Sequence, residues 1–187
     1  MIVNSGTIIR EHVTIHRSTQ ENGRTNIGEN CYLMAGAHVG HDCVIGNNVI
    51  LANCSLLGGF AKVDDRCFIG GGASIHQHVH IGEHVILGGY SATSLDLPPY
   101  IMSADRSSVV GLNIVGLKRA NFSIEQISEL KQCFKAVYNT TGNYREIAEQ
   151  ILASQKLKFP ESEKFLKFFI SPSERGVAPL RRKRKLR

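Results

Sequence analysis

A six-residue repeat dominates the first half of this chain and constrains its fold more than any other feature. Every sixth position from residue 27 to residue 87 is Ile, Leu or Val. Glycine usually follows it, and the fifth position of each hexad always holds a small or β-branched residue. A period of six matches neither an α-helix nor a simple strand. It predicts a short strand and a tight turn, repeated many times.

Three hexads would close a coil of about 18 residues, and stacked coils would form a solenoid whose first-position side chains fill the axis. Successive coils should lie about 4.8 Å apart, the spacing of paired strands. We expect glycine to supply the positive φ that the corners need. We expect small residues, including Cys31, Cys43 and Cys67, to point inward where the three walls crowd together.

The repeat and its interruptions divide the chain. Residues 1–97 form the predicted β-helix, with a polar loop near 17–26 projecting from one corner. Two prolines at 98–99 end it. The predicted fold class is mainly β with α: a left-handed parallel β-helix followed by a small C-terminal helical domain.

Residues 98–177 change to helical periodicity and form the predicted helical domain. Ser123 and Gln126 make a capping box in front of an apolar helical face. Asn143 and Pro160 are expected to begin two further helices. Such a domain can cover the open end of the solenoid, whose strand edges would otherwise invite association.

The net charge of +6 comes from the C-terminus. Residues 181–187 carry six basic side chains, and the remainder of the chain is balanced between acidic and basic residues. We expect 178–187 to be a disordered basic tail. No nucleic-acid-binding motif accompanies it, so no nucleic acid partner is predicted.

The sequence begins without the basic and apolar segments of a secretion signal, and no apolar run reaches the roughly 20 residues of a membrane span. The number of cysteines, 5, is odd, and none forms a Cys-x-x-Cys pair. These features favour a cytoplasmic protein with reduced, buried thiols and without a membrane span.

Histidines gather where the repeat would stack them. His41, Gly59 and Gln77 are separated by multiples of 18 and should share one outer column, with Asp42 and His76 beside it. A histidine titrates near neutral pH and can remove a proton from a hydroxyl. A carboxylate at Asp42 would orient the imidazole, and the Gly59 N–H could stabilise an oxyanion.

Metal binding is a rival interpretation of the same histidines. Some solenoids of this repeat are zinc hydratases resembling the gamma class of carbonic anhydrases, which hold zinc with three imidazoles. This chain could supply three across a subunit boundary, but our prediction is that no metal is bound.

Several motifs resemble the UDP-N-acetylglucosamine 3-O-acyltransferases of lipid A biosynthesis. The two that carry most of the likeness are Leu33-Met34-Ala35-Gly36-Ala37-His38-Val39-Gly40-His41-Asp42-Cys43 and Gly111-Leu112-Asn113-Ile114-Val115-Gly116-Leu117-Lys118-Arg119. The likeness covers about residues 7 to 177. It implies transfer of a 3-hydroxyacyl group from acyl carrier protein to the 3-hydroxyl of UDP-N-acetylglucosamine, the first step of lipid A biosynthesis.

The resemblance also implies roles and partners. His41 matches the general base, Asp42 its supporting carboxylate and Gly59 the oxyanion amide. The family is homotrimeric, with sites between subunits. It needs no cofactor, because the acyl-phosphopantetheine arm of acyl carrier protein arrives as a substrate. Six further positions match residues that contact the substrates or limit acyl length: His38, His76, Gln77, Gly89, Asn113 and Arg119.

Three departures from the family pattern leave alternatives open. The chain begins inside the solenoid, whereas family members have several more coils upstream. Phe60 stands where the family usually has histidine, and Val115 replaces an acidic residue that helps to bind the nucleotide. The alternatives are a related acyltransferase with a different sugar acceptor and a truncated, non-catalytic trimeric scaffold.

Overall fold

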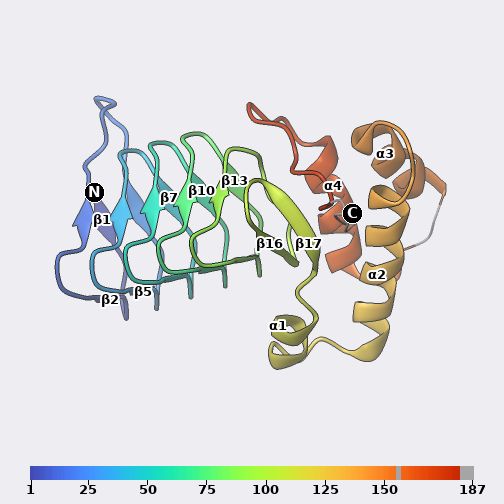
Figure 1. Cartoon of the computed structure of the whole chain (residues 1–187), viewed down its shortest axis with the longest axis horizontal. Helices are drawn as coiled ribbons and strands as arrows, with labels where there is room; N and C mark the ends of the chain where they lie inside the picture. The colour runs from blue at the N-terminus through green and yellow to red at the C-terminus, as the bar shows by residue number, and fades with distance from the viewer. Residues whose placement is uncertain (155–156, 182–187) are drawn as a thin grey trace, which may run out of the picture.

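A computed structural model describes residues 1–154 and 157–181 of the chain. The solenoid extends from the N-terminus as a three-sided prism, and a helical domain covers its C-terminal end (Figure 1). The predicted fold class, a parallel β-helix followed by helices, is therefore confirmed. No helix among the described residues combines the length and apolar character that a membrane crossing requires.

Each wall of the prism is a sheet of very short strands, one from each coil, and the first three strands each begin a different sheet. The first sheet consists of β1 (Ile2–Val3), β4 (Asn26–Ile27), β7 (Val44–Ile45), β10 (Lys62–Val63) and β13 (His80–Ile81). The second consists of β2 (Ile8–Ile9), β5 (Tyr32–Leu33), β8 (Ile50–Leu51), β11 (Phe68–Ile69), β14 (Ile86–Leu87), β16 (Ile101–Ala104) and β17 (Ser108–Leu112). The third consists of β3 (Thr14–Ile15), β6 (His38–Val39), β9 (Leu56–Leu57), β12 (Ser74–Ile75) and β15 (Ala92–Thr93).

The register of these strands confirms the 18-residue coil. His38 pairs with Leu56, and Leu56 with Ser74, in parallel ladders. Thr14 pairs instead with His38, because the loop near 17–26 adds one hexad to the first coil. The first-position residues from Ile27 onward are buried and fill the axis of the prism.

The corners differ from the prediction in their backbone. Positive φ occurs at the fourth hexad position, and mostly in residues other than glycine, such as Asp42 at 61° and Phe60 at 60°. The glycines at the second position have no positive φ. They are needed because the next coil passes too close for a side chain: a Cβ on Gly28 would lie 2.3 Å from the carbonyl oxygen of Gly46.

The three columns of turn residues define three corners of the prism. We call them the His41 corner (residues 41–42, 59–60 and 77–78), the Asp65 corner (47–48, 65–66 and 83–84) and the Gly71 corner (53–54, 71–72 and 89–90). Cys54 lies at the Gly71 corner with its thiol exposed, so the prediction of buried thiols is wrong for this residue. The other four thiols are buried, and burial raises the pKa of the Cys43 thiol to about 11.

The C-terminal domain contains a hairpin that the sequence analysis did not predict. β16 pairs with β14 in parallel and with β17 antiparallel, so the second sheet continues past the predicted end of the solenoid. Its helices are α1 (Ile114–Arg119), α2 (Ile124–Tyr138), α3 (Tyr144–Ser154) and α4 (Pro160–Ile170). The predicted capping box at Ser123 is present at the start of α2.

After α4 the chain returns to the solenoid as a strap, residues 171–181. Within it Val177 bridges to Asp96 and Leu180 bridges to Val109 in β17. Residues 178–181 are therefore packed on the domain, unlike the disordered tail predicted from residue 178. Residues 182–187 of that tail lie outside the described residues.

Candidate active site

The His41 corner holds a histidine–carboxylate pair with the geometry of a general base and its orienting partner. Nδ1 of His41 lies 2.9 Å from Oδ2 of Asp42. The His41 side chain is 36% exposed and that of Asp42 only 7%, so the imidazole is open to a substrate while its partner is shielded. An ionised carboxylate only accepts hydrogen bonds, which places the ring proton on Nδ1 and leaves Nε2 free as a base.

Asp42 is held by the loop that interrupts the repeat. The backbone N–H and the hydroxyl of Thr19 donate to Oδ2 at 3.0 and 2.8 Å. The Ser18 hydroxyl donates to Oδ1, and the Asp42 N–H donates to the Thr25 hydroxyl at 2.8 Å. Burial alone would raise the pKa of Asp42, but the hydrogen bonds from Ser18, Thr19 and His41 hold it well below its usual range. Asp42 is therefore a permanent anion at neutral pH.

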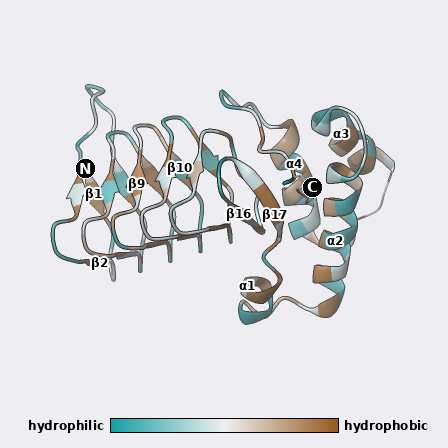
Figure 2. Cartoon of the chain, in the orientation of Figure 1, coloured by the Kyte–Doolittle hydropathy of each residue, from teal (hydrophilic) through white to brown (hydrophobic). Residues whose placement is uncertain are grey.

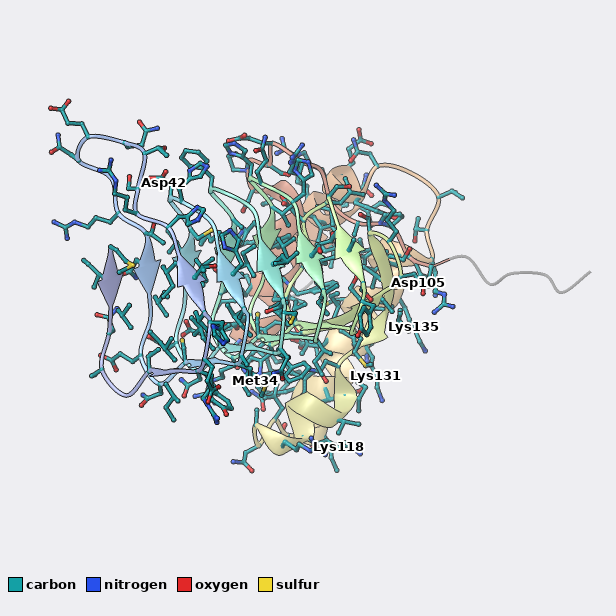
Figure 3. All side chains as sticks on the ribbon, turned by 60° about the vertical axis from the view of Figure 1, so that its left-hand side comes forward. Met34, Asp42, Asp105, Lys118, Lys131 and Lys135 are labelled. Atoms are coloured by element: carbon teal, nitrogen blue, oxygen red, sulfur yellow. The ribbon has the colours of Figure 1, made fainter. Side chains whose placement is uncertain are left out.

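The role of Ser18 and Thr19 was not predicted. The sequence gives a signal, since hydroxyl residues cluster in a loop beside His41, but polar loops are usually solvated and the contact with Asp42 depends on how the loop folds back. Figure 3 places Asp42 at the base of this projecting loop.

Removing these two hydroxyls should weaken catalysis without unfolding the chain. In the double variant Ser18→Ala and Thr19→Val, Asp42 loses two side-chain donors and orients His41 less well. We expect kcat to fall roughly tenfold, the effect of losing about one net hydrogen bond. Steady-state kinetics measures it, and Ser5→Ala in the first coil is the matched control. An unchanged kcat would mean that the loop does not orient the dyad.

Gly59 lies directly against the imidazole of His41. A Cβ at this position would come within 2.5 Å of both Cε1 and Nε2, so only glycine fits beside the ring. The next N–H, that of Phe60, donates to the His41 carbonyl at 2.9 Å, whereas the Gly59 N–H makes no hydrogen bond within residues 1–154 and 157–181. This is the amide predicted from the sequence to stabilise an oxyanion, and its N–H is left without a partner in the described residues beside the His41 ring.

His76 and Gln77 lie at the same corner, two coils further along. A Cβ on Gly58 would lie 2.7 Å from the Gln77 nitrogen, which places Gln77 directly beyond Gly58 in the stack. His38 lies on the adjoining third sheet, where Nδ1 contacts the Thr14 hydroxyl at 2.7 Å. Burial, with a contribution from the neighbouring His16, lowers the pKa of His38. The structure thus brings six of the nine predicted site residues, three catalytic and three substrate-contacting, onto one wall and its edge.

Three predicted substrate-binding residues lie elsewhere on this chain. Asn113 is buried and caps α1: its Nδ2 donates to the His84 carbonyl at 2.9 Å, and its Oδ1 accepts from the Gly116 N–H. Arg119 ends α1, the helix whose cap Asn113 contacts His84 of the Asp65 corner. Gly89 is exposed at the Gly71 corner. Figure 3 shows Asp42 and Lys118, the neighbour of Arg119, on opposite sides of the molecule.

Phe60 and Val115, the two residues that depart from the family pattern, lie in different surroundings. The Phe60 ring meets the His41 ring edge-on, with centroids 5.2 Å apart, and stacks on His78 at 4.8 Å. It therefore packs against the candidate base. Val115 is 60% exposed on α1. Among the described residues, no three His, Cys, Asp or Glu side chains converge as a metal site within one chain would require.

Comparison with known families agrees with the resemblance. The family described as UDP N-acetylglucosamine O-acyltransferase, domain 2, matches residues 96–178. Families of hexapeptide repeats match residues 24–59 and 61–90. A curated relative from Syntrophobacter fumaroxidans, acyl-[acyl-carrier-protein]–UDP-N-acetylglucosamine O-acyltransferase, is 43% identical over 95% of this chain and 69% of its own.

Solved structures agree in fold. The UDP-N-acetylglucosamine acyltransferase of Arabidopsis superposes with a TM-score of 0.89 at 31% identity, covering 94% of this chain and 64% of its own. That of Campylobacter jejuni gives 0.87 at 34% identity, covering 95% and 69%. The chain thus spans about two thirds of the length of these relatives. Identity, fold and the matched segments together establish that the chain belongs to the UDP-N-acetylglucosamine O-acyltransferase family.

Proposed function

We propose that this protein transfers a 3-hydroxyacyl group from acyl carrier protein to the 3-hydroxyl of UDP-N-acetylglucosamine, the first step of lipid A biosynthesis. The observation that carries the proposal is the His41–Asp42 pair beside Gly59, whose N–H makes no hydrogen bond within the described residues. The donor and acceptor are those named for the curated relative. The acyl-phosphopantetheine arm is a substrate, and no other cofactor is required. A cytoplasmic location stays a prediction.

The geometry supports a two-step acyl transfer. Nε2 of His41 removes the proton of the 3-hydroxyl while its oxygen attacks the thioester carbonyl carbon. The carbonyl electrons move to oxygen, and the Gly59 N–H donates to the resulting oxyanion. Collapse of this intermediate breaks the carbon–sulfur bond, and the His41 imidazolium returns the proton to sulfur. The products are the sugar ester and the free thiol of the carrier arm, and Asp42 stabilises the imidazolium between the steps.

Incubation of the purified protein with 3-hydroxyacyl carrier protein and UDP-N-acetylglucosamine tests this function, with mass spectrometry of the sugar product. We expect an ester, and no product from the 3-deoxy sugar, which lacks the nucleophile. The packing of Phe60 on His41 favours one alternative, a different sugar acceptor, because it changes the surface beside the base. Transfer to a 3-amino sugar nucleotide and not to the hydroxyl sugar would support that alternative.

A homotrimer would bring together residues that one chain keeps apart. His41, Arg119 and Gly89 lie at or near three different corners of the prism. A substrate that touches all three positions must therefore be enclosed by more than one copy of the chain. Water would also be excluded from a site covered by a neighbouring wall.

The second sheet offers the surface for such contacts. Its outward positions are apolar in every coil: Ile8, Tyr32, Ile50, Phe68, Ile86 and Met102. Phe68 and Met102 are 38% and 39% exposed in the single chain. Figure 2 shows hydrophobic colour along this lower edge of the solenoid, while the strands of the first sheet are mixed. A continuous apolar face of this kind is typical of a protein interface.

A charge on this face should break the trimer. In Phe68→Glu the carboxylate would be buried unpaired at the interface, which is strongly unfavourable. We expect the mass measured by light scattering to fall from three chains to one, and transfer activity to fall with it. Lys62→Glu on the outward side of the first sheet is the control and should stay trimeric. A wild-type monomer that is active would contradict the proposal.

A further inference from the structure

The strap brings a guanidinium back to the His41 corner. In Figure 1 the strap, in red, lies along the same upper edge of the solenoid from which the loop near 17–26 projects. Its backbone is anchored to Asp96, whose N–H donates to the Gly176 carbonyl at 2.8 Å and whose carbonyl accepts from the Ala178 N–H at 2.9 Å. The Ser173 hydroxyl donates to the Asp96 carboxylate as well. These bonds fix the strap without any help from the side chain of Arg175.

Arg175 uses its side chain on two predicted substrate-contact residues. Its Nε–H donates to the Gln77 carbonyl at 2.8 Å, and Nη2 hydrogen-bonds to Nδ1 of His76. No carboxylate in residues 1–154 and 157–181 forms a salt bridge with this guanidinium. The adjacent Glu174 instead lies 3.2 Å from Nδ1 of His78. The guanidinium is therefore directed to His76 rather than to an acidic partner.

This contact indicates which nitrogen of His76 carries the proton, because Nη2 lies much nearer to Nδ1 than to Nε2, which is 3.5 Å away. Arginine has only donors, so Nδ1 of His76 must be the acceptor. The Gln77 carbonyl lies 3.2 Å from the same Nδ1, but a proton on Nδ1 would point donor against donor at the Arg175 guanidinium. The ring N–H is then on Nε2. His76 is exposed, so this N–H is available to a bound substrate.

We propose that Arg175 is a positioning residue that fixes His76 in the Nε2–H form and so presents a hydrogen-bond donor to the substrate. The part of this inference that concerns substrate rests on the proposed function. Two coil spacings, about 10 Å, separate His76 from the level of His41. His76 therefore contacts the substrate away from the reacting oxygen, and Arg175 contributes to binding more than to the chemical step.

Nitrogen NMR of histidine-labelled protein tests the proton position directly, with His76→Ala used to assign the signal. We expect wild-type His76 to have an unprotonated Nδ1 and a protonated Nε2, and Arg175→Gln to show a mixture of the two forms. A proton on Nδ1 in the wild type overturns the proposal, whatever the activity. This measurement does not depend on catalysis, so it separates failure of the proposal from failure of the proposed function.

Kinetics supplies the second readout. Arg175→Gln should raise KM for the substrate that His76 contacts by about tenfold, with a much smaller change in kcat. Arg175→Lys should restore part of the loss, because it keeps one donor. In the His76→Ala background Arg175→Gln should have no further effect. Arg181→Gln is the matched control, since Arg181 lies in the same strap but pairs with Asp105. Additive effects of Arg175→Gln and His76→Ala would overturn the proposal.

Discussion

Replacing His41 by alanine should reduce acyl transfer by about a thousandfold, within the range contributed by a positioned general base. Without the imidazole, the corner loses the group that lies beside Gly59 and would take the proton of the sugar hydroxyl and return it to the departing sulfur. The side chain is partly exposed and lies outside the apolar axis, so the variant should keep its fold and its assembly. Turnover of carrier-protein thioester, measured together with circular dichroism, checks both parts of the prediction.

A second histidine–carboxylate pair provides the control. Nε2 of His80 lies 2.9 Å from Oδ2 of Asp64 on the first sheet, at the same separation as in the His41 pair. Among the described residues no glycine lies against the His80 ring as Gly59 lies against His41, and Phe168 of α4 packs on His80. His80→Gln should therefore keep wild-type turnover. Near wild-type turnover in His41→Ala would show that His41 is not the general base. Equal losses of turnover in His41→Ala and His80→Gln would indicate a general effect on structure.

Adding one methyl group at Gly28 should destabilise the solenoid by about 3 kcal/mol, the upper range for overpacking a tight site. The new Cβ would lie 2.3 Å from the Gly46 carbonyl oxygen and 2.5 Å from its carbon. Both are backbone atoms of the next coil, so no side-chain rotation can relieve the clash. The coils must separate locally, which weakens the ladder on both sides. Thermal unfolding at fixed protein concentration measures the loss.

Gly111→Ala is the matched control for this experiment. Gly111 lies in β17, and a Cβ there meets no atom within 4 Å. The substitution should leave the melting temperature close to that of the wild type. If Gly28→Ala has the same melting temperature as Gly111→Ala, close approach of the coils is not the reason for glycine at the second hexad position.

The axis of the solenoid was predictable because its signal is repeated many times. Each inward residue from Ile27 to Leu87 follows the same period, and the register of the strands follows from three hexads per coil. The corner histidine and its glycine could be aligned by the same arithmetic. The helix starts at Ser123 and Pro160 were predictable because capping depends on neighbouring residues only.

Features that depend on tertiary contact were not predictable in this way. The β16–β17 hairpin is short and lies between prolines and a helix, so no period reveals it. Asparagine is a common ligand-binding residue, yet the side-chain amide of Asn113 makes its hydrogen bonds within the chain through both Nδ2 and Oδ1. The hydrogen bond from the Ser18 hydroxyl to Asp42 joins residues that are 24 apart in the sequence, and the contact of Arg175 with His76 joins residues that are 99 apart. No local sequence pattern connects such partners.

The left-handed backbone at the fourth hexad position restricts which amino acids can replace those now at the His41 corner. Asp42, Phe60 and His78 all have φ near 60°. Asparagine, aspartate, histidine and glycine adopt this conformation most readily, whereas β-branched residues strongly resist it. Asparagine is thus the cleanest probe of the Asp42 charge, because valine or threonine would also alter the turn. The residues open to this wall during divergence therefore exclude β-branched side chains, while Phe60 shows that a large side chain is accepted.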